Sequence, residues 1–212
     1  MKKFPVGRIL LAAVVYFVFC LLGSTSGLLG PACFAYVGTV LAFLFSFEYL
    51  YVAANMRCFG AAALLNVFVL IIGLLWGEGD FPLVIGLLLL AAIAELVRKR
   101  NGYDTLKGVR LSYIPLAYSF YAYVAHWWTD TEGSLAAAAE EMPAGYADKM
   151  VPVIGNIPVL LLMLVLVIPM AIFGMRAAEK RLKHCNLSTK PKSAHKTKPP
   201  EKGTFQESGN AV

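Results

Sequence analysis

Long uninterrupted blocks of apolar residues constrain this chain more than any other feature. The blocks cover about 8–29, 31–51, 59–76, 81–98, 111–128 and 153–175. A helix needs about 20 consecutive, mostly apolar residues to cross the roughly 30 Å hydrocarbon core of a bilayer. Each block reaches or approaches that length. The sequence therefore predicts six transmembrane helices.

The overall composition agrees with a membrane protein. Apolar residues make up 58% of the 212 positions and charged residues 15%, against about 45–50% and about 25% in soluble domains. A water-soluble fold could not bury this excess. We expect an all-α integral membrane protein, with one six-helix bundle over residues 1–184.

Basic residues orient the predicted bundle. Of the 19 Lys and Arg residues, all but Lys149 fall on one side of the six spans, and the opposite connections are acidic. Because cytoplasmic loops carry the excess of Lys and Arg, both termini are predicted to be cytoplasmic. Lys2 and Lys3 could also begin a secretory signal, but the second apolar block follows at once, which favours a retained span.

The net charge of +6 comes from short clusters between the blocks and from the C-terminal tail. That distribution indicates membrane topology, so no nucleic-acid partner is expected. The tail, 185–212, is rich in Lys, Pro, Ser and Thr, and it cannot bury enough apolar surface to fold alone. We predict a basic, disordered cytoplasmic tail that is solvated or touches anionic lipid headgroups.

The predicted outer ends of the spans gather aromatic and polar residues. Aromatic walls with a few polar groups are typical of a small-molecule pocket. We expect a substrate pocket formed by Trp76, Glu78, Asp80, Tyr123, His126, Trp127 and Asn156. Two alternatives stay open, because Trp127 could belong to an interfacial aromatic belt and the Asn156 amide could bond a neighbouring helix.

Polar residues inside the predicted spans are costly unless they are paired. Glu95 precedes Arg98 and Lys99 by three and four residues, so helical spacing favours a local ion pair. The alternative is that Glu95 marks a proton route or a partner contact. Asn66, deep in the third block, is interpreted as a hydrogen-bonding contact between helices.

No motif for a catalytic or cofactor site occurs in the sequence. There is no nucleotide-phosphate loop, no HExxH and no GxSxG. The four cysteines show no CxxC spacing, so neither a metal site nor a disulfide framework is expected. We predict that the chain is not an enzyme, has no cofactor, and would need other subunits to hydrolyse ATP.

The order and spacing of several segments carry a family resemblance. These segments are GEGDFP at 77–82, AELVRKRNGY at 94–103, Ser112-Tyr113 and AGYADKM at 144–150. Over roughly residues 8–184 the chain resembles the MptD-type, or Trep_Strep, group of substrate-binding S components of energy-coupling factor (ECF) transporters.

That resemblance implies a bacterial plasma-membrane protein that captures a small micronutrient at the extracellular side. It also implies three partners, a transmembrane coupling subunit and two cytoplasmic ATPases. S components often dock the coupling subunit through an AxxxA pattern on the first helix. Here Ala12 and Ala13 are followed four residues later by Tyr16 and Phe17. Ala12, Ala13 and Glu95 are therefore predicted to contact a partner or to serve a structural role.

Two other functions compete with transport. One is a small membrane-embedded enzyme acting on lipid or isoprenoid substrates, with His126 and the outer acids as catalytic groups. The other is a structural accessory subunit, which would need no outward-facing cavity.

Overall fold

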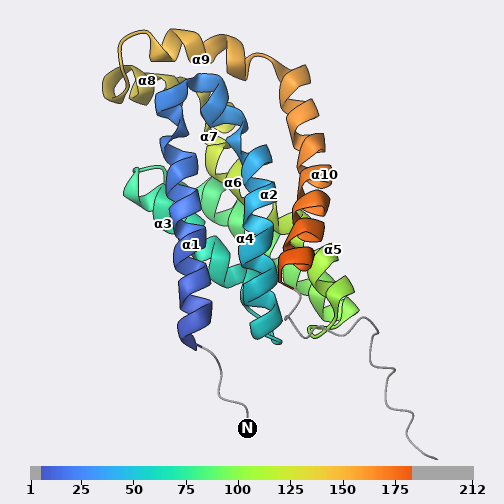
Figure 1. Ribbon diagram of the computed structural model, residues 1–212. Helices are drawn as coiled ribbons and strands as arrows, with labels where there is room; N and C mark the ends of the chain where they lie inside the picture. Colours follow the sequence, from blue (N-terminus) through green and yellow to red (C-terminus); the bar gives the residue numbers. More distant parts are fainter. Residues whose placement is uncertain (1–5, 183–212) are drawn as a thin grey trace, which may run out of the picture.

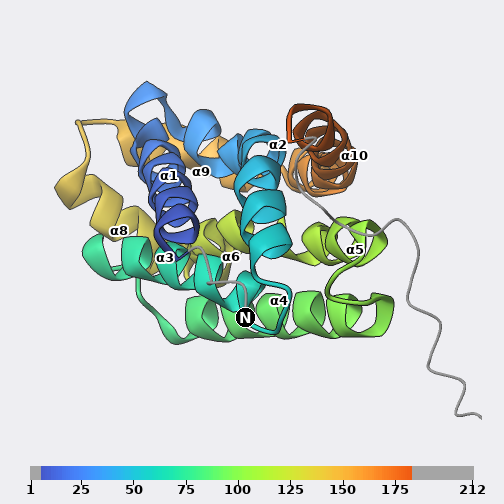
Figure 2. The same cartoon turned by 60° about the horizontal axis from the view of Figure 1, so that its bottom comes forward.

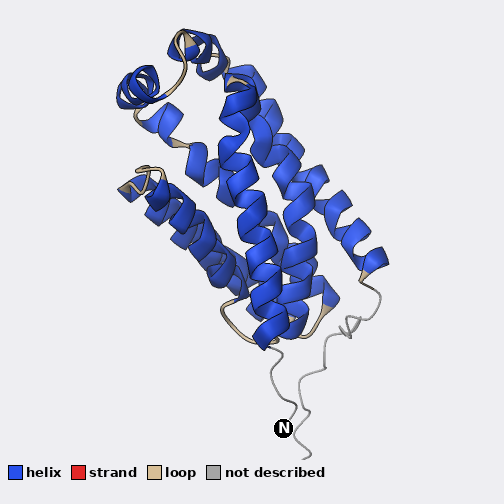
Figure 3. Cartoon of the chain, turned by 60° about the vertical axis from the view of Figure 1, so that its left-hand side comes forward, coloured by secondary structure: helices blue, strands red, loops and turns tan. Residues whose placement is uncertain are grey.

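The computed structural model describes residues 6–182, which contain helices and connecting loops but no strand (Figure 3). The elements are α1 (Val6–Ser24), the 3-10 helix η1 (Thr25–Leu29), α2 (Pro31–Asn55), α3 (Ala61–Leu75), α4 (Phe81–Asn101), α5 (Leu106–Leu116), α6 (Ser119–Val124), α7 (His126–Thr129), α8 (Thr131–Glu141), α9 (Tyr146–Ile154) and α10 (Ile157–Arg181). The predicted tail, 185–212, lies outside the described residues.

The long helices pack in two layers (Figure 2). One layer holds α1, α2 and α10, and the other holds α3, α4 and α5. Helix α2 contacts α1 and α10 in its own layer. It also contacts α3 and α5 in the other layer, and the short helix α6. Helices α8 and α9 lie across one end of the bundle, here called the roof end (Figure 1). The start of α1 and the end of α10 lie at the opposite, terminal end.

Four helical segments are long and apolar enough to cross a membrane. They are Val6–Leu29, Pro31–Asn55, Phe81–Asn101 and Ile157–Arg181. The all-α membrane class predicted from sequence is therefore supported. Helix α3 has 15 residues, and at 1.5 Å per residue it rises only about 22 Å.

The block 111–128, predicted as one continuous span, is divided among α5, α6 and α7. Pro115 lies inside α5, which ends one residue later. Proline lacks an N–H and its ring crowds the preceding turn, so it weakens the helix there. The predicted sixth block, 153–175, likewise includes the end of α9, since α10 begins at Ile157.

Hydroxyl and amide groups join the helices inside the bundle. The Tyr113 hydroxyl donates to the carbonyl oxygen of Ala42 on α2, at 2.5 Å. The Asn66 amide donates to the carbonyl oxygen of Leu87 at 2.8 Å and accepts from the Ser119 hydroxyl at 2.7 Å. Asn66 thus bonds α3 to both α4 and α6, which confirms its predicted role between helices.

Arg98, fully buried in the last turn of α4, ties the terminal end together. Its guanidinium donates to the carbonyl oxygens of Ala53 at 2.5 Å and Met56 at 2.6 Å, both at the end of α2. It also donates to the carbonyl oxygens of Cys58 at 3.4 Å and Tyr103 at 3.2 Å. One side chain therefore satisfies carbonyl groups from three segments of backbone.

The predicted local ion pair of Glu95 is not what the described residues show, because no salt bridge joins Glu95 to Arg98 or Lys99. Glu95 instead accepts a hydrogen bond from the backbone N–H of Ala62, at 2.9 Å. Ala62 lies in the first turn of α3, where backbone N–H groups have no partner within the helix. Glu95 thus caps α3 from α4, while Arg98 turns toward the carbonyls of α2.

Replacing Arg98 should destabilise the protein strongly. Arg98→Gln would leave several buried carbonyl groups without donors, at a cost of about 3 kcal/mol or more. For a chain of this size that corresponds to a fall of roughly 6–12 °C in melting temperature, measurable in detergent. Arg100→Gln is the matched control, because Arg100 is exposed in the same turn. Equal effects of the two substitutions would contradict this role for Arg98.

Candidate functional site

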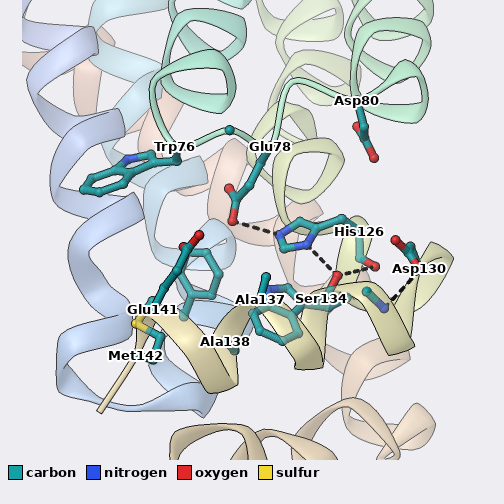
Figure 4. Close-up of a pocket in the computed structure, with 14 residues that line it drawn as sticks. Trp76, Glu78, Asp80, His126, Asp130, Ser134, Ala137, Ala138, Glu141 and Met142 are labelled. Carbon is teal, nitrogen blue, oxygen red and sulfur yellow. Dashed lines mark hydrogen bonds and ion pairs between the residues drawn. The ribbon is translucent and has the colours of Figure 1, made fainter.

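A cavity of about 270 Å³ lies beneath α8 at the roof end (Figure 4). Its lining comes from α2, the α3–α4 connection, α7 and α8. The residues are Phe34, Trp76, Gly77, Glu78, Asp80, His126, Trp127, Asp130, Gly133, Ser134, Ala137, Ala138, Glu141 and Met142. A second cavity of similar volume shares Phe34, Trp76, Glu78, Glu141 and Met142 with it and extends toward η1. The two form one hollow region under the roof.

The α3–α4 connection places Glu78 in this region. Helix α3 ends in a turn in which Gly77 has a φ of 74°, a left-handed conformation that glycine adopts at little cost. The Glu78 N–H then donates back to the carbonyl oxygen of Gly73 at 2.7 Å. The Asp80 carboxylate accepts from the Leu83 N–H at 2.9 Å and caps α4, which has proline in its first turn.

Helix α8 forms the cover of the cavity. Asp130 caps it by accepting a hydrogen bond from the Gly133 N–H at 3.2 Å. The alanine-rich sequence that follows has high helix propensity. Ser134, in the first turn of α8, is buried and faces His126 across the cavity wall. The cover is thus tied to α7 by a side chain.

Glu78, His126 and Ser134 form a chain of polar contacts (Figure 4). His126 Nδ1 is 2.9 Å from Ser134 Oγ, and the Ser134 hydroxyl donates to the carbonyl oxygen of His126 at 3.1 Å. The serine has one hydrogen, which can bond that carbonyl or Nδ1; when it bonds the carbonyl, the histidine proton lies on Nδ1, and we adopt this tautomer. His126 Nε2 is then an acceptor, and it lies 3.4 Å from Glu78 Oε1.

Burial shifts both titrating groups of this chain toward their neutral forms. His126 in α7 and Glu78 in the α3–α4 connection lie outside the four long apolar segments. Burial lowers the pKa of His126 to about 4, so the ring is uncharged at neutral pH. Burial also raises the pKa of the Glu78 carboxyl, although a hydrogen bond from Tyr123 opposes that shift. The contact between Glu78 and His126 is therefore not a full ion pair at neutral pH.

Several buried polar atoms in and around the cavity lack a hydrogen-bond partner within residues 6–182. They are Glu78 Oε2, His126 Nε2, Trp127 Nε1 and Tyr146 Oη. The Trp127 side chain is only 3% exposed and that of Tyr146 7%. An unpaired polar group in a buried position costs about 1–3 kcal/mol. Glu78, His126 and Trp127 line the first cavity, while four further atoms of this kind, in Tyr16, Glu48, Glu95 and Arg98, lie elsewhere in the bundle.

The structure brings together most of the pocket residues predicted from sequence. Trp76, Glu78, Asp80, His126 and Trp127 line the first cavity, and Tyr123 lines the second.

Asn156 lies apart from both cavities. Its side chain is exposed and caps α10 by accepting a hydrogen bond from the Val159 N–H at 3.3 Å.

The two alanines predicted to contact a partner occupy different environments. Ala13 is 1% exposed and packs inside the bundle. Ala12 is partly buried and lines a separate cavity near the terminal end, together with Glu48 and Tyr51. Of the pair, Ala12 is the one that a partner could reach.

Sequence reasoning missed part of the site, namely Phe34, Asp130, Ser134, Glu141, Met142 and Tyr146. Most lie on or beside the cover helix α8, within a region predicted only as an acidic connection. An aspartate followed by a run of helix-forming residues was a signal that could have located α8.

Removing the Glu78 charge should stabilise the ligand-free protein. A carboxyl with a raised folded-state pKa binds more protons folded than unfolded, so its ionisation costs stability as pH rises above about 4.3. The Glu78→Gln amide is uncharged and could donate to His126 Nε2, with an expected gain of about 1 kcal/mol. Melting temperatures at neutral pH should therefore rise by about 2–4 °C.

The gain in melting temperature should shrink as the pH falls toward 4, because Glu78 is then mostly protonated in both the folded and the unfolded state. Glu132→Gln is the control, since Glu132 is exposed on α8 and lies outside the cavity. A lower melting temperature for Glu78→Gln at neutral pH would show that the carboxylate stabilises the empty site.

Comparison with known proteins gives one match. The model of the Trep_Strep family, described as hypothetical bacterial integral membrane proteins, matches residues 6–185. No curated protein and no solved structure matches the chain. Since the family match covers most of the 212 residues, the chain belongs to the Trep_Strep family of bacterial integral membrane proteins.

Proposed function

We propose that this protein is the substrate-binding S component of an ECF-type importer. It captures a small micronutrient in the roof-end cavity and delivers it inward with a coupling membrane subunit and two ATPases. The observation that carries the proposal is a covered cavity with buried polar atoms that lack partners within residues 6–182. A structural accessory subunit would have no use for such a cavity.

The proposal requires the roof end to face the cell exterior. The last turn of α4 carries Arg98, Lys99 and Arg100, and the last turn of α10 carries Lys180 and Arg181. Both turns lie at the terminal end, so the positive-inside bias favours a cytoplasmic location for that end. In this arrangement two more crossings, one by α3 and one by α5 together with α6, bring the total to six. Helix α7 then lies beyond the outer end of the fifth crossing.

The proposed division of labour agrees with the chain's chemistry. Its sequence holds no phosphate-binding loop, so ATP hydrolysis belongs to the partner subunits. A partner could approach along α1, where Leu11 and Val15 are exposed on either side of Ala12. Ala13 is buried, which assigns it a structural role in this arrangement.

A second candidate function follows from the Ser134–His126–Glu78 chain of contacts. A serine, a histidine and a carboxylate in series can form a nucleophilic site, which would suit an enzyme acting on lipid or isoprenoid substrates. However, the Ser134 hydroxyl donates to a backbone carbonyl and its residue is buried, so it is poorly placed for attack. Covalent labelling of Ser134 by a fluorophosphonate would favour this alternative.

Two native cysteines provide a test of the proposed topology. Cys33 is exposed near the roof end of α2, and Cys58 is exposed in the α2–α3 connection at the terminal end. Two variants are compared, one that retains Cys33 without Cys58 and one that retains Cys58 without Cys33. A membrane-impermeant maleimide should label Cys33 in intact cells. Cys58 should react only after permeabilisation. The reverse pattern would place the cavity inside the cell and contradict the transport proposal.

Ligand binding tests the function directly. The tagged chain purified from its native membrane should carry the coupling subunit and both ATPases. At least one member of a micronutrient panel should raise its melting temperature. Trp127→Phe, which keeps a ring but removes the unpartnered Nε1, should reduce that increase.

Trp128→Phe is the matched control, because Trp128 Nε1 donates to the carbonyl oxygen of Ile154 at 3.1 Å and lies outside the cavity linings. A chain that purifies without partners and responds to no member of the panel would count against the S-component assignment.

A further inference from the structure

We propose that the roof-end cavity selects small organic cations. In this arrangement an ammonium or amidinium group binds between Glu78 and His126, and the apolar body of the ligand lies against Phe34 and Trp76. This inference rests on the proposed function and names the chemical class of its substrate.

Two hydrogen-bond acceptors face each other at the centre of the site. Glu78 Oε1 and His126 Nε2 are 3.4 Å apart, and both are acceptors in the tautomer that places the His126 proton on Nδ1, toward Ser134. Neither atom has a hydrogen to offer the other when Glu78 is ionised. A group with several N–H donors and a positive charge satisfies both acceptors at once. A carboxylate or phosphate placed there would add a third acceptor.

The charge of the lining also favours a cation. Four carboxylates line the first cavity, and no Lys or Arg does. Asp80 and Asp130 already cap helices, so their presence has a local explanation. Among residues 6–182, neither Glu78 nor Glu141 caps a helix. Of these, Glu78 has an oxygen, Oε2, that is buried without a partner.

The remaining unpartnered atoms indicate that the cation is organic. Trp127 Nε1 is a hydrogen-bond donor in a side chain that is 3% exposed, so it is available to an acceptor on the ligand. Within residues 6–182, no three His, Cys, Asp or Glu side chains are grouped as a metal ion would need. An organic ligand can supply a cationic group for Glu78 and, in addition, an acceptor for Trp127, whereas a bare metal ion supplies no acceptor.

Aromatic rings surround this polar centre. Phe34 packs edge-on against Trp127, with ring centroids 6.2 Å apart, and Trp76, which is half exposed, lines both cavities. Aromatic faces attract cations that have left water. The cavity volume of about 270 Å³ is near the lower end of the range for ligand pockets. A small ring or short chain bearing an amine fits these limits.

Protonation of Glu78 should oppose binding. The groups facing it are His126 from α7, Tyr123 from α6, Asp80 from its own connection, and Glu141 from α8, with Tyr146 of α9 also nearby. Burial raises the pKa of Glu78 above its ordinary value. As the pH falls through that raised pKa, the carboxylate becomes neutral and the affinity for a cation decreases.

The test uses matched aromatic probes with the full chain in nanodiscs. Benzamidine and benzylamine are cationic at neutral pH, benzyl alcohol is a neutral analogue and benzoate an anionic one. Trp76 and Trp127 line the cavity, so tryptophan fluorescence reports binding without any transport step. Both cations should give saturable changes and benzoate none. Glu78→Gln should weaken cation binding at least about tenfold, and Glu132→Gln should leave it unchanged.

Each other outcome overturns the proposal. Equal or tighter binding of benzyl alcohol or benzoate would exclude selection for cations, while leaving a ligand-binding function in place. Equal effects of Glu78→Gln and Glu132→Gln would show only general attraction to an acidic surface. Absence of binding by both cations would reject this substrate class, and the micronutrient panel would still decide the S-component function separately.

Discussion

The buried guanidinium of Arg98 is the interaction on which the arrangement of the long helices depends. It gathers carbonyl oxygens from the end of α2 and from the two connections beside it. Backbone groups in such a place have little access to water, so a missing donor would be costly. Glu95, one turn earlier, caps the start of α3. Together the two residues fix the start of α3 and the end of α4 at the terminal end.

The long helices could be predicted from sequence because hydrophobicity alone specifies them. Apolar blocks matched α1 with η1, α2 and α4 closely, whereas α10 begins four residues and ends six residues after the predicted sixth block. The fifth block was different, because average hydrophobicity does not register the loss of one helical hydrogen bond at Pro115. The breaks after it were therefore not predicted. They place the short helix α7, and with it His126, at the cavity instead of in a continuous span.

The candidate site was partly predictable for a related reason. Glu78 and His126 could be selected by their chemistry and their position near span ends. Ser134 could not, because only the folding of α8 back over the bundle brings it to His126. Glu95 shows the converse error. Its spacing to Arg98 suggested a local pair, but an unsatisfied N–H at the start of another helix was a better partner. Sequence spacing describes neighbours on one helix and gives no information about the helix packed beside it.

The polar groups that line the cavity carry an energetic penalty. A half-buried carboxylate with one unpartnered oxygen, a histidine nitrogen facing it and an indole N–H without a partner each reduce stability in the described structure. Apolar replacements at Glu78 and His126 would remove these acceptors, at the cost of the hydrogen bond that Tyr123 donates to Glu78. A protein whose only task was to support other subunits would gain from such replacements. A molecule with complementary hydrogen-bonding groups in the cavity would offset this penalty, which supports the binding role proposed above.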